Sequence, residues 1–122
     1  MDELIARLVA NVGVDRATAE KAVGIILDFL SKEGPPDKVQ TLIDKMPGVQ
    51  ALLQAEQASG SGGGMFSMGG IMGAGTRMMS AGLSMGQVQS VTKEVIAFSR
   101  EKVGEEAIGE IVDAIPGLSQ FV

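Results

Sequence analysis

The sequence predicts an all-α protein, a helical bundle of two pseudo-symmetric repeat units joined by a Gly/Met-rich linker. Two observations support this fold class. Apolar residues recur at helical spacing over most of the chain, and Gly or Pro interrupts the pattern at intervals of about one helix length. Aromatic residues make up only 3% of the 122 residues, so we expect an aliphatic core, which suits close helix packing.

Residues 1–56 are expected to form the first unit. An apolar stripe predicts a helix over about 2–12 that ends at Gly13. Asp15 is the predicted N-cap of a second helix, which ends at Gly34. Apolar residues cover more than one face of this second helix, so we expect it to lie at the centre of the bundle.

The first unit closes with two shorter helical segments. Pro35-Pro36 suits the first turn of a third helix, because the N–H groups of that turn have no intrahelical partner. Pro47-Gly48 breaks the third helix, and a short helical piece with Val49, Leu52 and Leu53 follows.

Residues 77–122 repeat this order in a second unit. Ser84-x-x-Gln87 is a capping-box pattern at the start of a long helix. Gly104 separates this helix from a shorter one, which Pro116-Gly117 breaks. We expect the whole chain to form one compact domain of six to eight helices.

The two units align without a gap at an offset of 69 residues. A fixed period indicates a repeated architecture, and two units this small would pack face to face around one shared core. The paired Asp residues lie near helix ends, where a cap or turn contact is favoured over catalysis. The repeat signature pairs Gly13 with Gly82, Phe29 with Phe98, Asp44 with Asp113, Pro47 with Pro116 and Gly48 with Gly117.

Residues 57–76 carry no charge and are rich in Gly, Ser and Met. The favoured interpretation is a flexible linker, because glycine-rich chains lose much entropy on ordering. A phosphate-binding loop is disfavoured, since Gly70-x-x-Gly73-x-Gly75 lacks the dinucleotide fingerprint and no P-loop Lys follows. A membrane segment is disfavoured because glycine dominates and leucine is absent.

Methionines cluster in and after this linker. Flexible Met side chains form adaptable apolar surfaces, which predicts a protein–protein interaction or scaffolding module that binds a protein partner or self-associates. The alternative is a binding module for an apolar ligand or Cu(I), for which Met65-x-x-Met68 has suitable spacing. The predicted interaction surface consists of Met65, Phe66, Met68, Met72, Met78 and Met79.

The last predicted helix carries an acidic cluster of Glu105, Glu106, Glu110 and Asp113. Glu106, Glu110 and Asp113 share one helix face, and such an arrangement can bind a hard cation weakly. The solvated polar face of an amphipathic helix is the favoured interpretation.

Composition disfavours several classes of function. The formal net charge is −5 and the basic residues are scattered, which argues against nucleic acid and membrane partners. His and Cys are absent, which removes the commonest general base, metal ligand and thiol nucleophile, so we expect no enzymatic activity, cofactor or metal. Asp2 and Glu3 stand where a secretion signal needs positive charge, which favours the cytoplasm.

Two short motifs resemble a known group of proteins. Gly82-Leu83-Ser84 followed by a helix, and then Ile115-Pro116-Gly117-Leu118, resemble small bacterial helical proteins of the YidB-like and related families. The resemblance covers residues 78–122 well and 10–55 more loosely. It implies an all-helical fold and assigns no activity or catalytic residues. The chain departs from these families in its Met-rich linker, where mainly Gly and Leu are expected.

Overall fold

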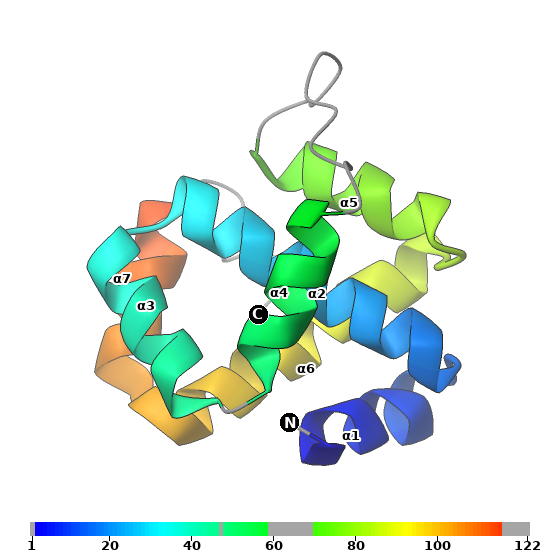
Figure 1. Ribbon diagram of the computed structural model, residues 1–122, viewed down its shortest axis with the longest axis horizontal. Helices are drawn as coiled ribbons and strands as arrows, with labels where there is room; N and C mark the ends of the chain where they lie inside the picture. Colours follow the sequence, from blue (N-terminus) through cyan, green and yellow to red (C-terminus); the bar gives the residue numbers. More distant parts are fainter. Residues whose placement is uncertain (1, 47, 59–69, 116–122) are drawn as a thin grey trace.

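The computed structural model describes residues 2–46, 48–58 and 70–115, which form seven α-helices and no strand (Figure 1). The predicted all-α fold class is thereby confirmed. The helices are α1 (Asp2–Val12), α2 (Arg16–Glu33), α3 (Pro36–Lys45), α4 (Val49–Ala58), α5 (Gly70–Ser80), α6 (Met85–Val103) and α7 (Glu105–Ala114).

Local sequence signals set most of the helix boundaries. Gly13 has a φ of +82° between α1 and α2, and Gly48 has a φ of +93° before α4, a backbone region that glycine enters without steric cost. The capping box at the start of α6 is confirmed: Ser84 Oγ accepts a hydrogen bond from Gln87 N–H, and Gln87 Oε1 accepts one from Ser84 N–H. Asp15 occupies the N-cap position of α2, but its side chain makes no cap hydrogen bond.

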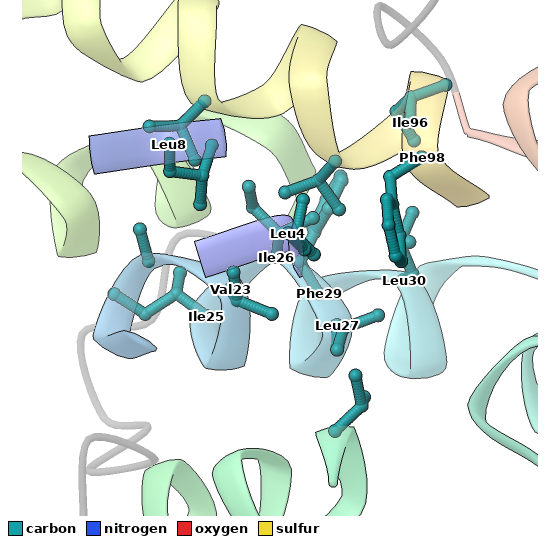
Figure 2. Close-up of a cluster of buried hydrophobic side chains, with 14 of the residues drawn as sticks. Leu4, Leu8, Val23, Ile25, Ile26, Leu27, Phe29, Leu30, Ile96 and Phe98 are labelled. Atoms are coloured by element: carbon teal, nitrogen blue, oxygen red, sulfur yellow. The ribbon is translucent and has the colours of Figure 1, made fainter. Parts of the chain in front are cut away.

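Helix α2 lies at the centre of the bundle, as its apolar pattern predicts. Every residue from Ala22 to Leu30 is buried, and the helix contacts α1, α3, α4, α5 and α6. In Figure 1, α4 lies across α2, and this is the most extensive contact between any two described helices. Figure 2 shows side chains of α1, α2 and α6 meeting in the core, among them Leu4, Ile26 and Phe98.

Helices from the N-terminal and C-terminal parts of the chain pack on one another. Helix α1 lies against α6, α5 lies against α2, and the two long helices also contact each other. Helices α3 and α7 contact one another, and one continuous hydrophobic cluster contains buried side chains from all seven helices. The helices before and after residues 59–69 therefore share one core in the described part of the chain.

Helix α5 begins inside the segment that the sequence assigned to a linker. Helix α4 extends to Ala58 and α5 starts at Gly70, so the linker prediction was wrong at both ends of 57–76, while residues 59–69 lie outside the described residues. Helix α5 packs along α2 and α6 and buries Met78. Packing of one face, rather than intrinsic propensity, supplies most of the stability of such a helix, so its glycines are tolerated.

The described helices are regularly spaced along the chain. Helices α3 and α7 lie 69 residues apart at both ends, and α1 and α5 lie 68 residues apart at both ends. The N-cap residues of α2 and α6, Asp15 and Ser84, are again 69 residues apart. Gly13 and Gly82 both have positive φ, and each precedes one of the two long helices.

Candidate interaction surface

The methionine cluster divides between the core and the surface. Met78 is buried in α5 with 2% of its surface exposed, whereas its neighbour Met79 is 47% exposed. Met78 therefore belongs to the core while α5 stays docked, and Met79 is available to a partner. The other members of the predicted surface lie outside the described residues or side chains: Met65, Phe66, Met68 and Met72.

A second exposed methionine flanks the same turn as Met79. Met85 opens α6 and is 60% exposed. In the described ranges, the only other large apolar side chain with more than a third of its surface exposed is Val9 on α1, at 39%. We call Met79 and Met85 the methionine corner. The surface predicted from the sequence did not include Met85, because the face that this residue occupies depends on how α6 packs.

Backbone hydrogen bonds fix the shape of this corner. Gly82 has a φ of +109°, and its N–H donates to Met79 O at 3.1 Å. Leu83 N–H donates to Met78 O at 3.2 Å, and both of these side chains are buried. The two bonds form a Schellman motif with its usual pair of apolar residues. Because Ser84 then caps α6, the two methionines lie on either side of a tightly bonded turn.

An ion pair with a buried carboxylate joins α5 to α2. Asp28 Oδ2 lies 2.9 Å from Arg77 Nη1 and 3.0 Å from Lys32 Nζ. The Asp28 side chain is 1% exposed, while those of Arg77 and Lys32 are 23% and 56% exposed. A buried carboxylate without a partner is strongly destabilising, so this pair fixes α5 against α2.

A more exposed ion pair joins α1 to α6. Arg7 Nη2 lies 2.9 Å from Glu101 Oε2, and the guanidinium carbon lies 5.5 Å from the centroid of the Phe98 ring. The hydrogen bond with Glu101 raises the pKa of Arg7 above its ordinary value. Lys102 Nζ lies 5.0 Å from the same ring centroid, so two cations contact Phe98, one from each helix.

The acidic cluster lies on the exposed face of α7. Glu110 Oε2 is 3.0 Å from Lys38 Nζ of α3, and this hydrogen bond raises the pKa of Lys38. Glu105, Glu106 and Asp113 are exposed. Within the described ranges, no group of three or more His, Cys, Asp or Glu side chains is placed to hold a metal ion. The arrangement fits a solvated helix face.

The residues of the repeat signature occupy structural positions. Phe29 and Phe98 are both buried. Asp44 is exposed and accepts a hydrogen bond of 3.1 Å from Gln40 Nε2, one turn earlier in α3, and Asp113 is exposed at the matching place in α7. Gly13, Gly48 and Gly82 all have positive φ and lie at helix ends. Three members lie outside the described residues: Pro47, Pro116 and Gly117.

Comparison with models of known protein families, with curated proteins and with solved structures finds no significant match. None of the helices that the structure describes is long and apolar enough to cross a bilayer. What the surface can bind therefore has to be inferred from its own side chains.

Proposed function

We propose that this protein is a non-enzymatic protein–protein interaction or scaffolding module whose methionine corner contacts a second copy of the chain. The observation that carries the proposal is the exposure of Met79 and Met85, at 47% and 60%, on either side of one hydrogen-bonded turn. Methionine side chains adapt to an apolar partner surface, and a fixed backbone lowers the entropy lost on association.

We further infer that the module is an internal duplication. A pseudo-twofold axis would exchange α1 with α5, α2 with α6 and α3 with α7. The 69-residue spacing of α3 and α7 supports this relation, as do the matched N-caps Asp15 and Ser84. The reciprocal contacts of α1 with α6 and of α5 with α2 are those that such an axis would relate. Helix α4 has no counterpart among the described residues.

The absence of catalysis is part of the proposal. It is supported by the lack of His and Cys in the sequence, because the commonest bases and nucleophiles are then missing. The carboxylates that the sequence analysis singled out are exposed, and two of them bond to neighbouring side chains: Asp44 to Gln40 and Glu110 to Lys38.

Light scattering from micromolar to millimolar concentration tests the proposed surface. The wild-type chain should show a mass that rises with concentration, and Met79→Ser/Met85→Ser should remain a monomer. Val9→Ser is the matched control, because it removes the other large apolar side chain that is exposed in the described ranges and should associate like the wild type. A strictly monomeric wild type, or equal association of the corner variant, would contradict the proposal.

A second candidate function is binding of Cu(I) or an apolar ligand. It is favoured by the two exposed thioethers that flank one turn at Met79 and Met85, since thioether sulfur is a preferred Cu(I) ligand. Titration with Cu(I) tests it. A variant with Met79 and Met85 changed to Leu should lose affinity if these two thioethers hold the ion, and a variant with Met65, Met68 and Met72 changed to Leu should lose it if the methionine-rich segment does. Unchanged affinity in both variants would contradict this function.

A further inference from the structure

The methionines whose side chains the structure describes fall into two groups by exposure. Met79 and Met85 are 47% and 60% exposed. Met46 and Met78 are 1% and 2% exposed. A thioether sulfur has to meet the oxidant directly, so an exposed sulfur reacts in the folded chain and a buried one reacts only when the fold opens. We propose that Met79 and Met85 are a modification site for peroxide oxidants and, as an extension that rests on the proposed function, that their oxidation releases a second copy from the methionine corner.

The proposed modification transfers one oxygen atom to each sulfur. A lone pair of the thioether attacks one peroxide oxygen, an S–O bond forms, the O–O bond breaks, and the other oxygen leaves as water with both protons. Sulfur gives two electrons to the peroxide, so hydrogen peroxide is the only co-reactant that the step needs. Two thiols reverse it by supplying two electrons and two protons, which yields a disulfide, water and the thioether, as in methionine sulfoxide reductases.

Met78 is the internal reference for this site. It is adjacent to Met79 in α5, and successive residues of a helix point about 100° apart. The Met78 side chain belongs to the hydrophobic core, whereas that of Met79 reaches solvent. Because the two residues share the same local sequence, a difference between their oxidation rates reports the packing of α5 and not the chemistry of its neighbours.

The turn between the two exposed methionines does not depend on their sulfur atoms. Gly82 N–H donates to the backbone carbonyl of Met79, and the Ser84 side chain caps α6. Sulfoxides at the corner would be solvated at the surface, so these contacts would remain. Oxidation of Met78 would instead place a polar group in an apolar core, which is destabilising. The corner can therefore be oxidised and reduced while the chain stays folded.

A sulfoxide changes what the methionine corner can bind. The thioether is apolar and flexible, whereas the sulfoxide is polar. An apolar partner surface would have to remove water from the sulfoxide oxygen without supplying a hydrogen bond, which weakens association by on the order of tenfold for each sulfoxide that is buried. Association also covers the sulfur atoms, so a bound copy should slow their oxidation.

Treatment of the dilute native chain with hydrogen peroxide tests the modification site. Cleavage after Arg77 and Lys93 gives one peptide, residues 78–93, that contains Met78 and both corner methionines, and fragmentation in the mass spectrometer locates each sulfoxide. The corner methionines should be oxidised about tenfold or more faster than Met78, and all three should react alike in urea that unfolds the chain. Equal rates in the folded chain, or loss of helical circular dichroism when only the corner is oxidised, would overturn the site.

Light scattering of the oxidised chain tests the release of a second copy. Oxidation at both corner positions should raise the dissociation constant by about tenfold or more, and methionine sulfoxide reductases should restore it. In a partly oxidised sample that is cross-linked at high concentration, the corner sulfoxides should be depleted from the dimer relative to the monomer. An even distribution between these two fractions would overturn the release.

The experiments separate this inference from the proposed function. A wild type that never associates would overturn the proposed function and the release together. The oxidation rates are measured in dilute solution, so the modification site is supported or overturned independently of association. A chain that associates equally well before and after oxidation of the corner would overturn the release alone.

Discussion

Arg77 Nη1 of α5 donates a hydrogen bond of 2.9 Å to Asp28 Oδ2 of α2, across 49 positions of sequence. Asp28 is 1% exposed and lies on the helix that forms the centre of the core. Thr92 and Ser99, the other buried polar residues in the described ranges, donate to carbonyl groups one turn earlier in their own helix. The Asp28–Arg77 pair therefore joins two helices where the surroundings are largely aliphatic.

Removing one partner of this pair should destabilise the fold more than removing both. Arg77→Met removes the charged partner that α5 supplies to the buried carboxylate and should lower the free energy of unfolding by about 2–4 kcal/mol, since breaking a buried pair leaves a poorly compensated charge. Asp28→Ala/Arg77→Met should recover most of that loss. Urea unfolding monitored by circular dichroism measures both.

The exposed pair Arg16–Glu20 is the control for this prediction. Arg16 Nε lies 3.2 Å from Glu20 Oε2, and the two side chains are 62% and 39% exposed. Arg16→Met should therefore change the free energy of unfolding little, because surface ion pairs contribute little to stability. A double variant at Asp28 and Arg77 that is less stable than Arg77→Met would contradict the account of the buried pair.

Most helix boundaries could be predicted because their signals are local. Gly13 with its positive φ, and the capping box of Ser84 and Gln87, act within a few residues, so the sequence contains them in full. The central position of α2 could also be predicted from the sequence, since a helix with apolar residues on several faces has to be buried.

Helix α5 and its contacts could not be predicted, because they depend on distant residues. Three glycines among eleven residues indicate a linker, and only packing against α2 and α6 makes this segment helical. Asp28 is buried together with a hydrogen bond from Arg77, which lies 49 positions away in the sequence. Met78 and Met79 are adjacent in sequence, and their opposite environments follow only once α5 is known to be a helix.

Gly82 and Gly109 should respond oppositely to substitution by alanine. A Cβ would meet no atom within 4 Å at either position, so packing does not distinguish them. Gly82 has a φ of +109°, and an alanine there should cost about 1–2 kcal/mol through backbone strain. Gly109 lies within α7, where alanine should add about 0.5–1 kcal/mol through helix propensity. Thermal unfolding of the two variants shows whether each substitution lowers or raises the stability of the fold. A stabilising Gly82→Ala would contradict the assigned turn.

Lys38 should titrate above the ordinary lysine value of 10.5, because its hydrogen bond to Glu110 favours the charged amine. Its pKa is higher in the folded than in the unfolded chain. The stability that this pair contributes is therefore present below about pH 10.5 and is lost as pH rises through the folded pKa. The ¹³Cε chemical shift of Lys38 measures the pKa directly. In Glu110→Gln the value should move back towards 10.5, and an unchanged value would contradict the pairing.

The two long helices should depend differently on their N-cap residues. Ser84 Oγ accepts the backbone N–H of Gln87 at 3.3 Å, so Ser84→Ala should lower the free energy of unfolding by about 1 kcal/mol. Asp15 occupies the matching position before α2 without a side-chain cap hydrogen bond, so Asp15→Ala should cost less than about 0.5 kcal/mol. Urea unfolding of the two variants at neutral pH compares them. Equal losses would mean that the charge of Asp15 near the N-terminus of α2, rather than a hydrogen bond, stabilises that helix, since an anion there interacts favourably with the helix dipole.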